Sequence, residues 1–405
     1  HGNFMANVMQ IQSVLGGVIA GGDVFLSILP LSHVYERTAG FYWPVCAGAR
    51  IAYAESFRTV LDDLRSVRPQ WLVSVPRLYE KIHAGVAAAM AQAPAFRKAL
   101  FEWSMRLARR NVAFACNGSR REGLFDLLYR VADSLVYSRL REAFGLDHLR
   151  CAISGGGPLS TADAEFFLGI GVTLLEGFGM TETSPVTNVN RPGMIKPGSV
   201  GTAFEDTQVR ISDEGELLVR GPQVMMGYYK NEAATKEVMT EDGFFRTGDI
   251  GEIDSDGYLK ITGRIKDLIV TSGGKNISPQ NIENSLKTSI YIEQVAVIGD
   301  NRKYLSALIV PAFAELENWA KNNGISFASR RELLEHPEVQ KLFAGEIQEN
   351  TKHYARVEQI RKFKLLDAEW SQQTDELTPT LKVKRRVIDK KYAREIESMY
   401  AEDRG

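Results

Sequence analysis

The chain has 405 residues, 44% hydrophobic and 24% charged, a composition typical of a globular protein with roughly two to four domains. Its 49 lysines and arginines nearly balance its 50 aspartates and glutamates, and the part from Lys266 onward is also balanced, with 22 basic and 21 acidic residues. Because there is no basic excess, the composition excludes a nucleic-acid-binding protein that works through its charge.

The cysteines Cys46, Cys116 and Cys151 are far apart and form no CxxC pair, so the sequence predicts no metal cluster. We expect buried thiols of a reducing compartment, the cytoplasm. The most apolar window, 14–31, is interrupted by two Gly-Gly pairs and by Asp23. It therefore predicts a helix end, a turn and a buried strand rather than a membrane span.

The first 190 residues alternate apolar strand patterns with helical patterns, beginning with a helix that Asn3 caps. Strands are predicted at 24–29, 51–53, 71–75, 151–154 and 173–178, and helices at 3–15, 58–67, 77–144 and 162–170. This alternation predicts an α/β fold with a largely parallel sheet covered on both faces.

After Pro192 the pattern changes to short alternating strands joined by turns, which predicts a β-rich subdomain over about 192–264. The remaining residues, 265–405, are predicted to form a small α+β domain. Its strands are expected at 295–298 and 305–310, and its helices at 281–287, 314–321 and 387–399.

A glycine-rich turn, Ser154-Gly155-Gly156-Gly157-Pro158, follows a predicted strand and precedes a predicted helix. Glycines at such a place let the backbone approach a flat or charged ligand, and the helix N-terminus favours anions. A tight turn with no ligand explains the same residues. The pattern is neither GxGxxG nor GxxxxGK[ST], so no dinucleotide or Walker-type motif supports it.

The segment 176–185, Glu-Gly-Phe-Gly-Met-Thr-Glu-Thr-Ser-Pro, also follows a strand. Its two glycines bracket an aromatic ring that suits stacking on a purine. Thr181 and Glu182 place a hydroxyl and a carboxylate side by side, as a phosphate contact and a Mg²⁺ ligand require. The alternative is a surface turn with a solvated Glu182.

Two further segments carry charges suited to a nucleotide. Asp249 could accept hydrogen bonds from both hydroxyls of a ribose, and Arg264 could reach the ribose or phosphates, although a turn and an ion pair explain them equally well. Lys382 begins a cationic cluster with Lys384, Arg385 and Arg386, which the simplest interpretation treats as a solvated face.

The order of these segments resembles the adenylate-forming enzymes, and among them the AMP-forming long-chain fatty-acid–CoA ligases. Residues 29–37, Leu-Pro-Leu-Ser-His-Val-Tyr-Glu-Arg, are similar to the family's strand-end motif. Residues 75–82 resemble the segment that gates the family's acyl tunnel, and residues 217–231, which end in Met-Gly-Tyr-Tyr-Lys-Asn, resemble a further family segment. The helical insertion 95–144 is similar to one that marks the long-chain class. The resemblance covers essentially the whole chain and implies a large domain of mixed and parallel sheets, a β-rich subdomain and a small mobile C-terminal domain.

The resemblance also implies a role for each matched residue. The implied catalytic residues are Lys382, Glu182, Thr181 and His33. Of these, Glu182 is the implied metal ligand, His33 lies near the acyl carboxylate, and Lys382 orients the carboxylate and the phosphate. Lys266 is the hinge of the C-terminal domain, and Gly273 and Gly274 line the pantetheine tunnel. The nucleotide contacts are Gly155, Gly156, Glu176, Gly177, Phe178, Gly179, Met180, Thr181, Asp249, Ile261 and Arg264.

The sequence departs from the family pattern at two places. Phe178 stands where many relatives have tyrosine, so stacking is kept and a hydroxyl contact is lost. The family's phosphate loop, which ends just before a His-Gly-Asn like that of residues 1–3, is absent. We therefore expect this stretch alone to adenylate poorly while still binding AMP or acyl-adenylate.

The implied reaction is the ATP-dependent activation of a fatty acid to acyl-adenylate, followed by thioester formation with CoA. Its cofactors and partners are ATP or AMP, Mg²⁺, CoA and a long-chain fatty acid, with peripheral contact to the inner face of a membrane left open. A ligase that loads a carrier protein and a non-catalytic nucleotide- or acyl-binding module are the alternatives. Without the resemblance, His33 would be interpreted as a core histidine.

Overall fold

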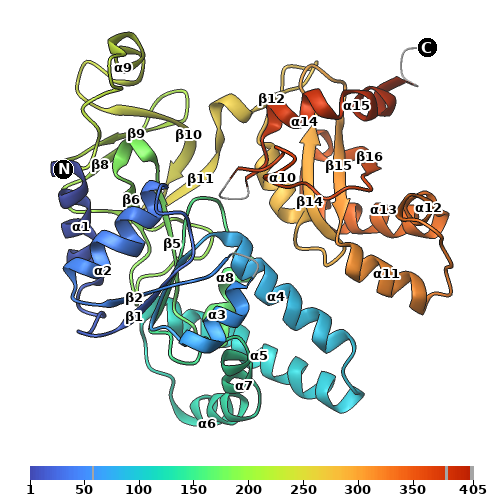
Figure 1. Ribbon diagram of the computed structural model, residues 1–405, viewed down its shortest axis with the longest axis horizontal. Coiled ribbons are helices and arrows are strands. Elements are labelled where there is room, and N and C mark those ends of the chain that lie inside the picture. The colour runs from blue at the N-terminus through green and yellow to red at the C-terminus, as the bar shows by residue number, and fades with distance from the viewer. Residues whose placement is uncertain (57–58, 379–381, 402–405) are drawn as a thin grey trace. The chain divides into compact units, whose positions relative to one another are not determined.

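The computed structural model describes residues 1–56, 59–378 and 382–401, shown in Figure 1. The chain divides into two compact units, an N-terminal unit His1–Ile261 and a C-terminal unit Thr262–Gly405. The sequence places its domain boundary at 264/265, close to this division. Each unit has its own hydrophobic core.

The N-terminal unit is built on a seven-stranded sheet in the order β2-β1-β3-β4-β5-β6-β7. Pairing along the first five strands is parallel, and β6 and β7 continue the sheet antiparallel. The strands are β1 (Val24–Ser27), β2 (Arg50–Tyr53), β3 (Trp71–Ser74), β4 (Cys151–Ser154), β5 (Leu174–Gly179), β6 (Val186–Val189) and β7 (Thr202–Ala203). The predicted α/β fold is thereby confirmed.

Helices cover both faces of this sheet, as the sequence predicts. One face, with Leu72 and Ala152, packs mainly against α3 (Val60–Val67), α4 (Pro76–Ala91) and α8 (Thr161–Gly169). The opposite face, with Val73 and Ile153, packs mainly against α1 (Gly2–Leu15), the π-helix η1 (Glu36–Tyr42) and α2 (Trp43–Cys46). Successive residues of a strand point to opposite faces, so the apolar runs of β3 and β4 supply both cores.

The predicted helical stretch 77–144 is a series of helices. It begins with α4 and continues with α5 (Ala95–Asn117), α6 (Gly123–Ala132), the π-helix η2 (Asp133–Tyr137) and α7 (Ser138–Ala143). The break after α5 lies at Gly118, whose φ of 61° is left-handed, as is common where helices end. Of these, α5 packs along α8, which holds the insertion to the sheet.

The β-rich subdomain is a four-stranded sheet in the order β11-β10-β9-β8. Its elements are β8 (Gln208–Ile211), β9 (Glu216–Arg220), α9 (Glu232–Val238), β10 (Phe245–Ile253) and β11 (Leu259–Arg264). Strand β10 is longer than the short strands that the sequence pattern predicts for this subdomain. Since the division between the two units falls at Ile261, β11 leads from one into the other.

The C-terminal unit contains a three-stranded sheet, β14 (Ile292–Ile298), β15 (Leu305–Pro311) and β16 (Ile360–Leu365), and a short hairpin, β12 (Ile269–Val270) with β13 (Asn276–Ile277). The helix predicted at 387–399 is wrong as a single element, because the chain leaves helical geometry at Tyr392. The helices are α10 (Pro279–Leu286), α11 (Phe313–Asn322), α12 (Arg330–Glu335), α13 (Pro337–Thr351), α14 (Arg385–Lys391) and α15 (Ala393–Tyr400).

Two expectations from composition are met only in part. Cys116 and Cys151 are buried, and burial raises the pKa of the Cys116 thiol to about 11. Cys46, however, is exposed at the end of α2, so the expectation of three buried thiols is wrong there. Among the described residues, no helix combines the length and the apolar character that crossing a bilayer requires.

Candidate functional site

The candidate site lies at the carboxyl ends of the parallel strands, where α/β sheets bind their ligands. Ser74 and Ser154 end β3 and β4, and Glu176 of β5 is the register partner of Ser154, so the three form a polar row across the sheet. All three are buried, and the Oγ atoms of Ser74 and Ser154 have no hydrogen-bond partner in the structure. A buried row of unpaired hydroxyls is unusual for a purely structural sheet edge.

The glycine-rich turn continues directly from this row. The backbone N–H of Gly155 donates to the carbonyl of Ser74 at 3.1 Å, which ties the turn to the neighbouring strand. A Cβ at Gly155 would lie 2.9 Å from the Tyr35 ring, and Gly156 has a φ of 78°. The turn therefore requires glycine at both positions, at one for close packing and at the other for its conformation.

His33 lies in the loop between β1 and η1, half-buried. Its Nδ1 accepts a hydrogen bond from the backbone N–H of Tyr35 at 3.2 Å, which fixes the ring at the start of η1. From the same helix, Thr38 Oγ1 donates to the carbonyl of Ser184 at 3.1 Å. The structure thus brings the strand-end motif, the glycine-rich turn and the segment 176–185 together in one unit.

The segment 176–185 is held as a rigid loop. It ends β5 and then forms a single 3₁₀ turn, Thr181–Thr183. Thr183 Oγ1 accepts the backbone N–H of Met180 at 3.1 Å, and the backbone N–H of Met180 also reaches the carbonyl of Pro185 at 3.1 Å. A side chain at Gly179 would meet the Pro185 carbonyl at 2.1 Å, so only glycine closes this loop.

Phe178 and Ile261 pack on the same apolar cluster of the β-rich subdomain, formed by Leu217, Val219 and Leu259. Both are partly exposed, so each offers one side to the cluster and one to solvent. Gly177, between Glu176 and Phe178, packs against β6, where a Cβ would lie 3.2 Å from the carbonyl of Asn188. A partly exposed ring with a fixed apolar backing is suited to stacking on a flat base.

Glu182 is half-buried, and its Oε1 accepts a hydrogen bond from the Tyr228 hydroxyl at 2.9 Å. Partial burial and this carboxylate raise the pKa of Tyr228 to about 12, so Tyr228 remains a donor at neutral pH. The carbonyl of Glu182 also accepts the backbone N–H of Met225 at 2.7 Å, which docks the segment 225–228 on the loop. The sequence did not predict this partner, although Tyr228 belongs to a segment it singled out.

The donor set around Glu182 fits Mg²⁺. A carboxylate oxygen and the hydroxyl of the exposed neighbour Thr181 are hard oxygen ligands. No group of three or more His, Cys, Asp or Glu residues that could hold a metal occurs in the described part of the chain.

Two buried carboxyl groups at this end of the sheet have raised pKa values. Burial raises the pKa of Glu176 to about 8, although its Oε1 accepts the backbone N–H of Gly198 at 2.9 Å. Burial likewise raises the pKa of Glu36 to about 7, against hydrogen bonds from Ser27 and the backbone N–H groups of Ile28 and Leu29. The Oε2 of Glu36 has no partner. Glu36 is not among the residues predicted from the sequence, because nothing in a glutamate's residue type indicates that it is fully buried.

Glu36→Gln is expected to flatten the pH dependence of stability. A carboxyl group whose folded-state pKa is raised from 4.5 to about 7 stabilises fully below pH 4.5 and loses that contribution as the pH rises through 7. Between pH 5 and pH 8 the unchanged protein should lose about 2 kcal/mol more unfolding free energy than the variant. Urea unfolding at the two pH values measures this. Glu176 is present in both proteins, so its contribution to the pH dependence cancels in the comparison. Equal losses of unfolding free energy would contradict the raised pKa of Glu36.

Asp249 lies in an irregular stretch of β10, where the pairing with β9 shifts between Arg246 and Ile250. Gly248 has a φ of 70° there, and its N–H donates to the buried Glu216 at 2.9 Å. The N–H of Asp249 donates to the Thr247 hydroxyl at 3.0 Å. The bulge thus fixes the backbone of Asp249 and leaves its side chain partly exposed, as a ligand contact requires.

The remaining predicted residues belong to the C-terminal unit. Arg264 ends β11, and Lys266 lies in the 3₁₀ turn Ile265–Asp267 that follows it, both exposed. Gly273 and Gly274 are exposed in the turn between β12 and β13. These positions suit a hinge and a loop at the surface.

Lys382 is exposed at the end of a narrow loop whose two sides are joined by a β-bridge between Leu377 and Val383. Its backbone N–H donates to Thr378 Oγ1 at 3.0 Å, and the intervening residues 379–381 lie outside the described part of the chain. The base of the loop is fixed by Glu376, which is 1% exposed and bonded to Lys391 and Tyr392.

The cationic cluster is not one solvated face. Lys384 forms an ion pair with Asp375 at 2.5 Å, and Arg385 binds the buried Glu283 and donates to the carbonyl of Val297 at 3.0 Å. Arg386 is exposed at the start of α14. The simplest interpretation, one solvated face, therefore does not hold for Arg385, which is part of the packing of the C-terminal unit.

Arg385→Ala is expected to destabilise the chain by about 3 kcal/mol, because it leaves the Glu283 carboxylate buried without its cation. Lys384→Ala should cost less than about 1 kcal/mol, since its partner Asp375 is 68% exposed. Urea unfolding of the two variants measures the difference. Equal losses would show that the Arg385 pair contributes no more than a surface pair.

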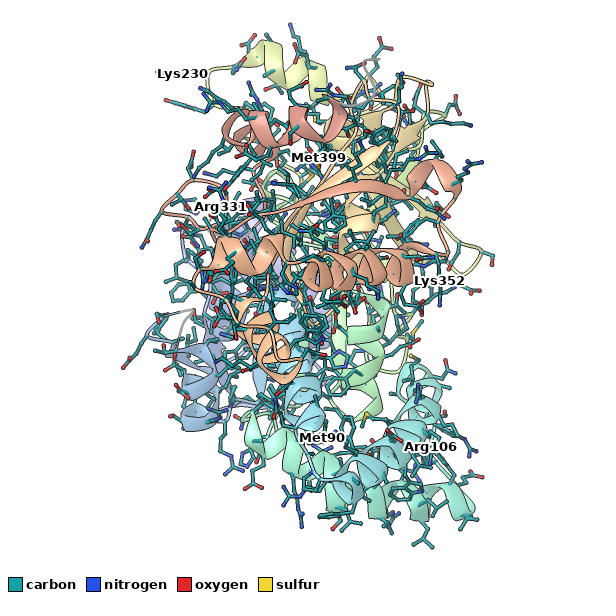
Figure 2. The ribbon with its side chains drawn as sticks, turned by 90° about the vertical axis from the view of Figure 1, so that its right-hand side faces the viewer. Met90, Arg106, Lys230, Arg331, Lys352 and Met399 are labelled. Carbon is teal, nitrogen blue, oxygen red and sulfur yellow. The ribbon has the colours of Figure 1, made fainter. Side chains whose placement is uncertain are left out.

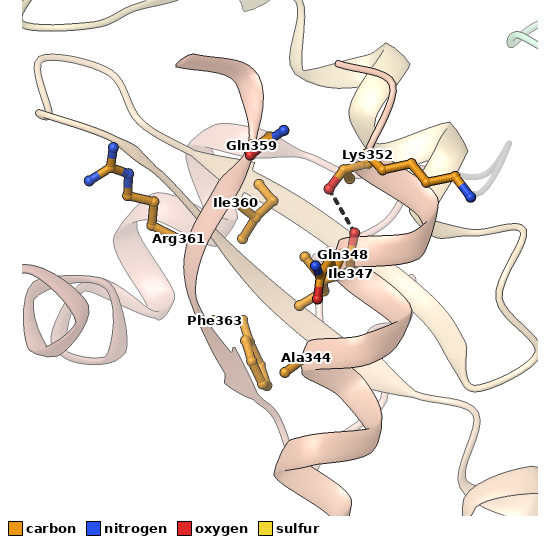
Figure 3. A pocket seen from close by; sticks show the side chains of 9 residues that line it. Ala344, Ile347, Gln348, Lys352, Gln359, Ile360, Arg361 and Phe363 are labelled. Atoms are coloured by element: carbon orange, nitrogen blue, oxygen red, sulfur yellow. Dashed lines mark hydrogen bonds between the residues drawn. The ribbon is translucent and has the colours of Figure 1, made fainter. Parts of the chain in front are cut away.

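The described chain also contains a pocket of about 400 Å³ between α13 and β16 (Figure 3). Phe363 of β16 and Ala344 of α13 point toward one another there, and the charged ends of Lys352 and Arg361 point away from them. It lies wholly within the C-terminal unit and includes none of the predicted site residues.

Comparisons with known proteins place the chain in a family. Residues 1–229 match the family model of the AMP-binding enzymes, and residues 266–404 match that of the AMP-binding enzyme C-terminal domain. The chain is 37% identical over 405 residues to a Mycobacterium tuberculosis protein named as a fatty-acid–CoA ligase, fadD11, and covers 70% of its length. It is also 37% identical over 383 residues to the long-chain-fatty-acid–CoA ligase FadD15 of Mycobacterium bovis, with 94% of this chain and 62% of the relative aligned.

Among solved structures, the adenylation domain of the carboxylate reductase of Mycobacterium chelonae has the same fold, with a TM-score of 0.75 at 21% identity. That alignment covers 98% of this chain and 57% of the other. The chain therefore belongs to the AMP-binding enzyme family, and the fatty-acid–CoA ligases of that family are relatives that it matches over its whole length.

Proposed function

We propose that the chain forms the adenylate- and thiol-binding part of an AMP-forming long-chain fatty-acid–CoA ligase. The observation that carries the proposal is the loop 176–185, which presents the Phe178 ring, the Thr181 hydroxyl and the Glu182 carboxylate from one fixed backbone. The similarity to fatty-acid–CoA ligases over the whole chain supports a fatty acid as the substrate and CoA as the acceptor.

In the proposed first half-reaction, an oxygen of the fatty-acid carboxylate attacks the α-phosphate of ATP, and the bond to pyrophosphate breaks. Phe178 and Gly155 hold the adenine, Asp249 accepts the ribose hydroxyls, and Thr181 donates to a phosphate. Lys382 places positive charge beside the carboxylate and the α-phosphate, where negative charge accumulates. Mg²⁺, held by Glu182, supplies neutralisation of the phosphate charge when it is bound.

In the proposed second half-reaction, the CoA thiol attacks the acyl carbonyl of the adenylate and AMP leaves. Rotation about Lys266 withdraws Lys382 and brings Gly273 and Gly274 to the pantetheine chain. No side-chain nucleophile is required, which agrees with the buried, protonated state of Cys116 and Cys151. The cytoplasm is the location that we propose for this reaction.

The second half-reaction tests the proposal on this chain. Synthetic palmitoyl-adenylate is mixed with the 405-residue protein and either CoA or a phosphopantetheinylated carrier protein, and the thioester is followed by mass spectrometry. Formation of palmitoyl-CoA with release of AMP is the expected result. Preference for the carrier would replace CoA as the acceptor, and failure of the protein to bind AMP or palmitoyl-adenylate would overturn the proposal.

A further inference from the structure

The helix α6 and the π-helix η2 that follows it expose a stripe of apolar side chains. Leu124, Leu127, Val131 and Leu135 are 71%, 59%, 42% and 41% exposed. Their spacing of three, four and four residues places them along one side of a helix. Single exposed apolar residues are normal on a protein surface, whereas four in a row on one helix side form a patch that needs a partner.

The other side of the same helix explains why the stripe faces outward. Tyr129 and Ala132 are buried in the core below the sheet, and Phe125 stacks on Phe114 of α5 with ring centroids 5.3 Å apart. Tyr129 also donates to the carbonyl of Gly169 at 2.9 Å. Since this inner side is fixed by packing, α6 cannot turn its apolar stripe inward.

The helical insertion around the stripe is strongly basic. Residues 95–144 contain ten basic and five acidic residues, a net charge of +5 in a chain whose total is −1. Three of the ten basic residues pair with two of the acids within the insertion, because Asp126 pairs with Arg121 and Arg130, and Asp133 pairs with Arg141. The exposed cations are Arg97, Lys98, Arg106, Arg109, Arg110, Arg120, Arg130 and Arg139.

These cations lie on the elements next to the stripe. Arg110 of α5 is 4.7 Å from the centroid of the Phe125 ring, so it reaches α6 itself. Arg130 belongs to α6, and Arg139 belongs to α7 directly after η2. Figure 2 shows Arg106 on α5 at the end of the N-terminal unit that the insertion forms. Cations therefore lie on α6 itself and on the neighbouring helices α5 and α7.

We infer that α6 and η2 dock the protein on an anionic lipid surface. An amphipathic helix with apolar residues on one side and arginines around it lies in the plane of a bilayer, with the apolar residues among the acyl chains. Anionic lipids add a factor of about five in affinity for each basic residue near the surface. An apolar protein partner would not account for the net charge of +5. The choice of a lipid surface rests in part on the proposed function, whose fatty-acid substrate dissolves in membranes.

Vesicle flotation tests the inference without using activity. The 405-residue protein is floated with vesicles of phosphatidylcholine alone and with vesicles containing 30% phosphatidylglycerol, at low and high salt. We expect binding at least about tenfold stronger to the anionic vesicles, and we expect high salt to weaken it. Equal recovery with both vesicle types, or no binding to either, would overturn the inference.

Variants separate the stripe from general electrostatic attraction. Leu127→Ser combined with Val131→Ser keeps the net charge and should reduce binding to the anionic vesicles at least about tenfold. The matched control is Val357→Ser in the C-terminal unit, since Val357 is 40% exposed and lies outside the insertion. Arg106→Glu combined with Arg109→Glu tests the cations in the same way. Thermal unfolding confirms that each variant is folded.

Two outcomes assign the stripe to another occupant and overturn the inference. If the Leu127 and Val131 changes convert a dimer to a monomer, the stripe covers a second copy of the chain. If they leave vesicle binding unchanged, the stripe has no contact with lipid. AMP binding, measured on the same proteins, should remain unchanged throughout, so a failure of the proposed function is recognised separately.

Discussion

In a ligase that contains the family's phosphate loop, Lys382→Ala is expected to slow acyl-adenylate formation by a factor of about 10²–10³. Thioester formation from synthetic acyl-adenylate and CoA should stay near the rate of the unchanged enzyme. The ε-ammonium group stabilises negative charge on the carboxylate and the α-phosphate, and that charge develops only in the first half-reaction. Pyrophosphate exchange into ATP measures the first half-reaction. Mass spectrometry of the thioester measures the second.

The structure supplies the control for this experiment. Lys382 is exposed on a loop whose base is fixed by Glu376 and by the bridge from Leu377 to Val383, so removing its side chain should leave the loop intact. Arg386 is the matched control, since it is exposed in the same cationic cluster. Arg385 is unsuitable as a control, because its removal would leave the buried Glu283 carboxylate without its cation.

Arg386→Ala should therefore leave both half-reactions unchanged. If Arg386→Ala slows adenylation as much as Lys382→Ala, the cluster acts through its total charge. If Lys382→Ala slows both half-reactions equally, Lys382 is structural and its assignment is wrong.

Much of the fold is predictable because its signals are local. Apolar runs such as 71–75 and 151–154 have the length of buried strands, and the structure contains β3 and β4 at those places. The long helical stretch 77–144 and the turn-rich strands after Pro192 are equally local patterns, and both elements are present. Strand β6 was missed, because its Thr187 and Asn188 are fully buried polar residues that interrupt the apolar pattern.

Features that depend on contacts across the sequence could not be predicted. Asn3 was expected to cap the first helix, but α1 begins at Gly2 and the Asn3 side chain donates to the carbonyls of Pro222 and Val224 at 2.9 and 2.8 Å. The ion pair of Arg385 with Glu283 and the hydrogen bond of Tyr228 with Glu182 join residues distant in the chain. Motifs identify which residues are special, whereas only the fold shows what else holds them.

Glu182→Gln is expected to weaken the use of Mg²⁺-ATP far more than the binding of AMP. Glutamine keeps the shape of the side chain and an oxygen that can accept the Tyr228 hydroxyl, so it removes the charge and little else. A hard cation loses most of its attraction to a neutral amide. Isothermal titration with AMP, and adenylation rates measured over a range of Mg²⁺ concentrations, give the two quantities in a ligase that contains the family's phosphate loop.

Tyr228→Phe is the matched control, because it removes the hydrogen bond to Oε1 and keeps the carboxylate charge. If Glu182 holds the metal, Tyr228→Phe should change the Mg²⁺ dependence little, and Glu182→Gln should shift it to much higher concentrations. If Glu182 is only a turn residue, Glu182→Gln should leave turnover unchanged and alter stability by no more than about 0.5 kcal/mol. Equal loss of AMP and Mg²⁺-ATP affinity would instead assign Glu182 to the shape of the nucleotide pocket, because a metal ligand acts on the triphosphate and leaves AMP binding nearly unchanged.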